Sequence, residues 1–260
     1  MRSRSLLMAA FALAVLVAWK FPTAPAPKHY RIQLKMTQVV DLTSLGQTEQ
    51  RQSLGSVGFV TVTLADTAGG KTITILLDSL QPDSGSPIPA EAAKAAAGIT
   101  WHGLVGSNGR ISGLKSESDN IIASQMTGIM REFLPPVPPG TQAGKSWTDT
   151  TENTDNVNNG SMAVRTVTNF QSSSETYAGV KAVKIACASS SSVTGTQETG
   201  SGSATIEGTG TGTGTWYIAP DGSYLGGTRN GTQNLAVSGS FAPEPLPVTV
   251  TIESTTAILK

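Results

Sequence analysis

Cysteine, histidine and charged residues are scarce in this chain of 260 residues, and each scarcity excludes a class of protein. The single cysteine, Cys187, cannot form an intramolecular disulfide, so the fold must be held by its core. The two histidines, His29 and His102, form neither an HxxxH nor an HExxH pair, which argues against a zinc site. Basic and acidic residues balance at 18 each, and without net charge we expect no nucleic-acid partner.

Motifs for catalysis and cofactor binding are also missing. The chain has no GxSxG elbow, so a serine hydrolase would need an unrecognised arrangement around one of the two histidines. The stretch PGTQAGKSW around Lys145 has three residues between Gly140 and Gly144, where a phosphate-binding loop needs four. The DNVNNG stretch has Val157 at its third position, where a calcium loop needs an oxygen ligand. We therefore expect no catalytic residue, no metal and no cofactor.

Apolar residues form a long run near the N-terminus. Arg2 and Arg4 precede an apolar stretch at 6–19, which has the n-region and h-region of an export signal. Its 14 residues would span about 21 Å as a helix, less than a comfortable membrane crossing. The small residues at 24–26 offer a poor cleavage site because Pro27 follows, so an uncleaved membrane anchor stays open. We interpret 1–28 as a signal or signal-anchor segment with a Pro-rich spacer.

The remaining chain, 29–260, predicts one β-rich domain. In YRIQLKM, Tyr30, Ile32, Leu34 and Met36 alternate with polar residues, which is typical of a half-buried strand. Two hairpins are expected, one over 60–77 with a turn at 66–70 and one over 101–115 with an Asn-Gly turn. Further strands are expected at 161–170, 177–188, 203–218, 223–237 and 247–259.

Two helices interrupt the strands. A short Ala-rich helix is predicted at 89–97, and a longer one is predicted to follow an Asp119 cap and run to Phe133. A Pro-rich connector at 134–140 then divides the fold into two halves. The longer helix carries an apolar stripe that we interpret as core or as the floor of an apolar groove. The stripe consists of Ile122, Met126, Ile129, Met130 and Phe133.

Two features of the second half predict close packing. Val183, Ile185 and Cys187 share one face of a strand, so the cysteine is expected to be a small buried apolar side chain. Glycines alternate with threonines over 208–215, which leaves one face of that strand without side chains. A neighbouring strand layer, an aromatic ring or a ligand must lie close to it.

The YRIQLKM strand, the FLPPVPPG element, GKSWTDTT and TGTGTWYIAPDG together resemble exported bacterial β-rich proteins of unknown function. Such proteins place a Pro-rich element before a Gly-x-Ser-Trp strand and a Gly-rich strand before a Trp-Tyr hairpin. The resemblance implies a fold and a compartment, and it carries no catalytic residues. The strand order with an inserted helix is also similar to the half-barrel of lipoprotein carriers, in which a curved sheet encloses an apolar groove.

These observations favour a mainly β fold with one or two helices (α+β), as a curved antiparallel sheet or half-barrel packed on a helix. The expected function is that of a non-enzymatic periplasmic or cell-envelope protein, membrane-anchored if its signal is not cleaved, that binds an apolar or lipid-like ligand. Three alternatives stay open: an outer-membrane β-barrel, a structural or adhesive envelope module, and an unrecognised hydrolase. Aromatic residues at 5% leave little for the two interfacial girdles of an outer-membrane barrel.

The first prediction concerns export. A reporter that is active only outside the cytoplasm, fused behind residues 1–28, should be exported because the segment has the charge and apolar length of a signal. Replacing Arg2 and Arg4 with glutamate should reduce export, since the positive n-region sets the orientation. Cytoplasmic retention of the unmodified fusion would contradict the interpretation.

Overall fold

A computed structural model of the chain describes residues 26–68, 70–138, 140–157, 160–199, 202–240 and 242–259. Of the predicted signal and spacer at 1–28, residues 1–25 lie outside the described residues, and Lys28 already belongs to the first strand. Within the described ranges, no helix combines the length and apolarity that a membrane crossing requires.

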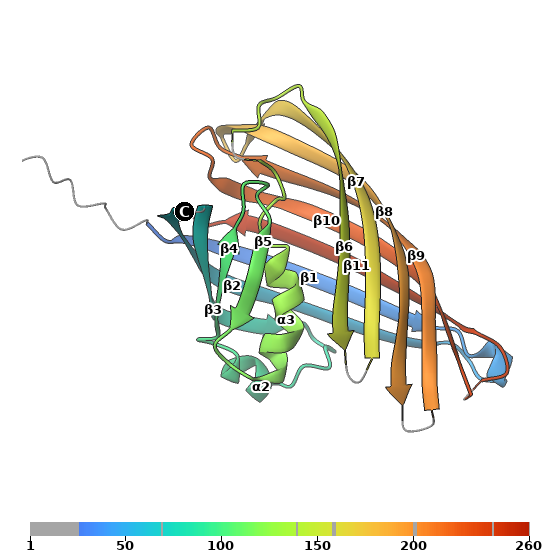
Figure 1. Cartoon of the computed structure of the whole chain (residues 1–260). Helices are drawn as coiled ribbons and strands as arrows, with labels where there is room; N and C mark the ends of the chain where they lie inside the picture. Colours follow the sequence, from blue (N-terminus) through green and yellow to red (C-terminus); the bar gives the residue numbers. More distant parts are fainter. Residues whose placement is uncertain are drawn as a thin grey trace, which may run out of the picture.

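The described residues form eleven strands in one antiparallel sheet, together with short helices (Figure 1). The predicted mainly β fold is therefore confirmed. The elements are β1 (Lys28–Val40), η1 (Thr43–Leu45), β2 (Gln50–Thr67), β3 (Gly70–Pro82), α2 (Ala90–Ala95), β4 (Thr100–Val105), β5 (Ile111–Ser116), α3 (Ile121–Arg131), β6 (Ser146–Val157), β7 (Gly160–Tyr177), β8 (Val180–Thr199), β9 (Gly202–Ile218), β10 (Tyr224–Gly239) and β11 (Leu246–Ile258).

The sheet consists of two meanders joined by the first and last strands. Its order is β5-β4-β3-β2-β1-β11-β10-β9-β8-β7-β6, so every strand from β1 to β5 and from β6 to β11 pairs with its sequence neighbour. The junction is an antiparallel pairing that sets Tyr30 opposite Ile258 and Met36 opposite Ile252. Among the described residues the sheet is not closed, and β5 and β6 are its edges.

Both hairpins predicted in the first half are confirmed. β2 and β3 pair across the 66–70 turn, with Val62 opposite Ile75, and β4 and β5 pair across the Asn-Gly turn. Gly109 in that turn has a φ of +77°, and a Cβ there would lie 2.3 Å from the carbonyl oxygen of Val137. The Pro-rich connector therefore lies directly against the β4–β5 turn.

Strand bounds in the second half differ from the prediction. β8 extends to Thr199, well past the expected end at 188, and β6 covers twelve residues, of which the resemblance implied a strand only around GKSW. Serine and threonine dominate the extension of β8, and polar residues of several kinds dominate that of β6. Such residues also fill loops, so the sequence gives no apolar alternation there. β6 is held in the sheet by its pairing with β7, and the end of β8 by its pairing with β9, although neither segment has the apolar alternation of a strand.

Figure 1 shows α2 and α3 on the inner side of the curved sheet. The buried apolar residues form one cluster that includes residues of the strands and of both helices. Ile73, Ile75 and Leu77 of β3 are completely buried, as the alternation of that strand predicts. The same cluster includes Phe170, Ile185 and other residues of the second meander. One buried cluster therefore draws on both meanders.

Helix α3 begins one residue later than predicted. Its N-cap is Asn120, with extended backbone angles and a side-chain oxygen that accepts a 2.7 Å hydrogen bond from the Ile122 amide. The Asp119 cap was therefore wrong, and the adjacent asparagine performs the same chemistry. Further along α3, Thr127 accepts a 3.0 Å hydrogen bond from the indole nitrogen of Trp101 on β4, which fixes the helix to the sheet at this point.

Three aromatic rings meet where the chain leaves α3. Phe133 lies edge-on to Tyr30 of β1 at 5.0 Å and to Tyr224 of β10 at 5.7 Å between ring centroids. The Tyr30 hydroxyl donates a 3.0 Å hydrogen bond to the carbonyl oxygen of Tyr224. Burial raises the pKa of both tyrosines well above the usual range. The cluster thus joins both meanders to the end of α3.

The second prediction tests this cluster. Phe133→Ala should lower the free energy of unfolding by about 3 to 5 kcal/mol, because it removes a 95% buried ring and both edge-to-face contacts. The measurement is chemical denaturation followed by circular dichroism. The matched control is Phe59→Ala. Phe59 lies on the outer face of β2 and is only half-buried, so its replacement should lower the free energy of unfolding clearly less. Equal losses in the two variants would contradict a central role for Phe133.

Candidate functional site

An apolar groove of about 390 Å³ lies between α3 and the inner face of the sheet. Helix α3 and the strands β1, β2, β3 and β11 provide its walls, together with the loop before α2. Most lining side chains are aliphatic or methionine. They are Ile32, Leu34, Met36, Leu54, Ser56, Gly58, Leu80, Ile88, Ile122, Met126, Ile129, Met130 and Ile252.

Four of the five predicted groove residues line this groove. Ile122 and Met130 are buried and form its inner part, whereas Met126 and Ile129 are half-buried. The fifth, Phe133, lies outside the groove in the aromatic cluster. The apolar stripe read from the helical spacing therefore covers two neighbouring features, the groove and the aromatic cluster, which the sequence alone does not separate.

The sheet side of the groove comes from residues with different sequence signals. Leu34 and Met36 lie on the apolar face that the YRIQLKM alternation predicts. Ile252 was not predicted, because only the pairing of β1 with β11 places it opposite Met36. Ile252 is 39% exposed although its side chain is large and aliphatic. The groove is therefore open to solvent along β11.

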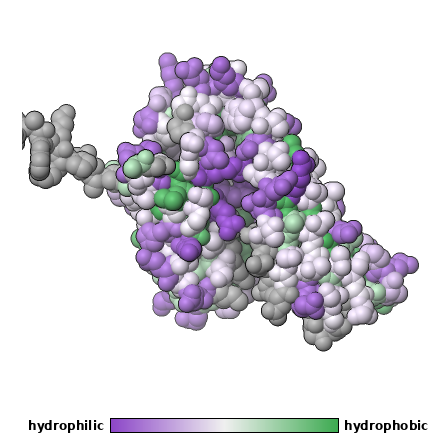
Figure 2. Space-filling model, viewed as in Figure 1, coloured by the Kyte–Doolittle hydropathy of each residue, from purple (hydrophilic) through white to green (hydrophobic). Residues whose placement is uncertain are grey.

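Apolar side chains are otherwise well covered on the side of the molecule drawn in Figure 2. Hydrophilic and neutral residues dominate that face, and its apolar areas are small and separate. The groove gathers its apolar side chains from α3 and four strands of the sheet.

A charged pair stands at the rim of the groove. Arg229 of β10 forms an ion pair with Glu132, the residue that ends α3. Glu132 follows the groove residue Ile129 by three positions, so the two are neighbours on the helix surface. Side chains of Arg229 and Glu132 are 43% and 59% exposed, so water reaches both. The groove is therefore apolar inside and charged at this edge.

The glycine-rich face of β9 is covered by side chains of its neighbours. A Cβ at Gly210, Gly212 or Gly214 would lie 2.6 Å from the Ser191 oxygen, 2.8 Å from the Ser189 oxygen or 3.1 Å from the Cys187 sulfur, respectively. Side chains of β8 therefore lean over β9, and this close approach requires glycine. The close neighbour that the glycine alternation of β9 predicts is therefore the adjacent strand β8 of the same sheet.

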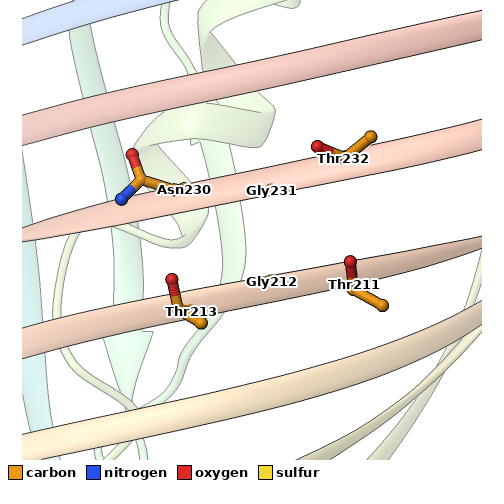
Figure 3. Close-up of a pocket in the computed structure, with 6 residues that line it drawn as sticks. All are labelled: Thr211, Gly212, Thr213, Asn230, Gly231 and Thr232. Atoms are coloured by element: carbon orange, nitrogen blue, oxygen red, sulfur yellow. The ribbon is translucent and has the colours of Figure 1, made fainter.

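A smaller depression of about 190 Å³ lies on β9 and β10, where a glycine of one strand pairs with a glycine of the other. Figure 3 shows Thr211, Thr213, Asn230 and Thr232 around the paired Gly212 and Gly231. The four polar side chains project on one face of the two strands, because alternate residues point to the same face, and the backbone of the two glycines lies between them. The depression is polar and open, unlike the groove beside α3.

His102 belongs to a row of polar side chains on the outer face of the sheet. Its Nδ1 lies 3.1 Å from the Thr74 hydroxyl and its Nε2 lies 2.8 Å from a carboxylate oxygen of Glu117. The order hydroxyl, imidazole, carboxylate is that of a hydrolase triad, but the two ring nitrogens are exchanged relative to that arrangement. Both His102 and Glu117 are at least half exposed. These contacts match a cross-strand surface network.

Metal ligands do not gather in the part of the chain that the structure describes. No group of three or more histidine, cysteine, aspartate or glutamate side chains there is placed to hold a metal ion.

Cys187 is half-buried beside Gly214, on the same face as the completely buried Ile185. Burial raises the pKa of its thiol, while Arg229 and the Gly214 backbone act in the opposite direction with smaller effect. The thiol therefore stays protonated to higher pH than an exposed cysteine.

Comparison with known proteins identifies no family. No family model matches the chain, and no curated protein matches it. A crystal structure of Acinetobacter baumannii OccAB4 aligns over 92% of this chain and 100% of that chain, with a TM-score of 0.25 and 6% sequence identity. At this TM-score the alignment carries no argument about fold or function.

The third prediction concerns the reactivity of Cys187. At about pH 8 the native thiol should react with a bulky maleimide at least about tenfold more slowly than free cysteine, because a raised pKa leaves less thiolate and the side chain is partly covered. Unfolding in guanidinium should restore the ordinary rate. Equal rates in the native and unfolded protein would contradict this position for the thiol.

Proposed function

We propose that this chain is a non-enzymatic, exported cell-envelope protein that binds an apolar or lipid-like ligand in the groove beside α3. In this proposal the curved sheet is a half-barrel packed on α3, and the helix forms one wall of the binding site. The observation that carries the proposal is the groove itself, which has thirteen lining residues and only one polar side chain among them, that of Ser56.

The size and chemistry of the groove support a small apolar ligand. Its volume of about 390 Å³ lies within the usual range of ligand sites, about 300 to 1,000 Å³. Three methionines, Met36, Met126 and Met130, line it. Methionine side chains are flexible and polarizable, so they adapt to the irregular shape of an alkyl chain. Such a wall suits ligands that vary in chain length or branching.

The exposure of the groove gives an energetic reason to bind. Ile252 is exposed, and Leu34, Met36, Met126 and Ile129 are only half-buried. Each methylene group that a ligand buries against such side chains contributes about 0.8 kcal/mol. A medium-length alkyl chain therefore gains enough to offset the entropy lost on binding. Export would bring the protein to a compartment where lipids and their breakdown products are available.

The fourth prediction fills the groove. Met126→Trp should lower the affinity for an environment-sensitive naphthylamine dye by at least about tenfold, because the indole would occupy space that the ligand needs. Dye fluorescence on titration into the full chain measures the affinity, and thermal unfolding reports whether the variant is folded.

The matched control is Leu104→Trp, which adds the same ring at a 54% exposed position outside the groove. Dye binding by this variant should equal that of the wild type. Met36→Trp fills the groove from the sheet side and should act like Met126→Trp. Wild-type protein that leaves the dye dark, or folded variants that all bind equally, would refute the proposed ligand site.

A further inference from the structure

The rim of the groove carries information about the polar end of the ligand. We infer that the ligand is a single-chain amphiphile with a carboxylate head group, and that Arg229 binds this head group at the mouth of the groove. This inference rests on the proposed function, since it assumes that the groove holds an alkyl chain.

The strand register places Arg229 on the groove side of the sheet. Arg229 lies opposite Ser254 of β11, and Ser254 lies opposite the groove residue Leu34 of β1. Directly paired residues point to the same face of a sheet, so the three side chains share the inner face. The ion pair with Glu132 of α3 agrees with this direction. Arg229 therefore stands on the strand next to β11, which forms one wall of the groove.

Open space joins Arg229 to the groove. Gly231 follows Arg229 by two residues on the same face and lies opposite Ile252, the exposed groove residue. A Cβ at Gly231 would meet no atom nearer than 3.6 Å, whereas a Cβ at Gly214 would touch the Arg229 side chain at 3.4 Å. The stem of Arg229 thus rests on Gly214, and the area over Gly231 is free for a ligand that leaves the groove past Ile252.

The present partner of Arg229 indicates which head group fits. Glu132 offers a carboxylate, and its contact engages Nη1 of a guanidinium that has five N–H donors. A planar carboxylate matches the donor fork of arginine better than a hydroxyl does. Because both partners are about half exposed, their ion pair is weak, and an incoming carboxylate can share or replace it.

The test compares two amphiphiles of equal chain length, dodecanoate and dodecanol, at about pH 8, where the carboxylate is ionised. Displacement of the naphthylamine dye from the full chain measures both affinities. Arg229→Gln should weaken dodecanoate roughly two- to fivefold and leave dodecanol unchanged, which is the range expected for a half-exposed charge contact. Glu132→Gln should strengthen dodecanoate by a similar factor, because it removes the competing carboxylate. Arg229→Lys should retain part of the affinity.

The matched control is Arg165→Gln, which breaks an arginine–glutamate pair with Glu152 that is remote from the groove residues, and it should change neither affinity. Unchanged dodecanoate binding in Arg229→Gln, or an equal loss for dodecanol, would overturn the head-group assignment while the groove stands. If Arg229→Gln fails to fold, Glu132→Gln decides, and no gain for dodecanoate overturns the assignment. A wild-type protein that binds the dye and neither amphiphile also overturns it, whereas one that binds none of the three refutes the groove and the inference together.

Discussion

The pairing of β1 with β11 is the contact on which the rest of this structure depends. It joins the two meanders into one sheet, and its register decides which residues meet across the junction. Tyr30 and Ile32 lie in the buried cluster, and Leu34 and Met36 line the groove, because all four occupy one face of β1. A slip of one residue would turn this entire set to the outer face and place polar residues inside. Core and groove are therefore specified by the same alternation.

The difference in length between helix and strands explains why a groove exists at all. An α-helix of eleven residues such as α3 is about 16 Å long, whereas a strand of twenty residues such as β8 extends for about 65 Å. In the proposed half-barrel, α3 can cover only part of the inner face. Outside that cover, the sheet carries either exposed aliphatic residues, as at Ile252, or glycine and serine, as at Gly212 and Ser189. Smaller side chains limit the apolar surface that would otherwise be exposed.

Local features of this fold could be predicted from the sequence, and features of its long-range pairing could not. The hairpin of β2 and β3 was predictable because apolar alternation flanks a glycine-rich turn, and the spacing of Ile122, Met126, Ile129 and Met130 identified the helical wall of the groove. Ile252 carries no such signal, because its role depends on a pairing between residues more than 200 positions apart. The long Ser- and Thr-rich part of β8 was missed for a related reason: its order comes from neighbouring strands rather than from its own pattern.

The split within the apolar stripe of α3 shows how one helix serves both stability and the proposed binding site. A stripe wider than about 100° presents more apolar surface than one flat contact can cover. On α3, Ile122 and Met130 are buried, while Met126 and Ile129 stay half-exposed and face the groove. Covering the latter two fully would require either more sheet or a ligand. Since Glu132 ends the same helix and pairs with Arg229, the half-exposed part of the stripe leads directly to the charged rim. The apolar wall lies on α3 and the acidic partner of the rim follows its last residue, so the contacts that fix α3 through Trp101 and Phe133 also set the distance between wall and rim.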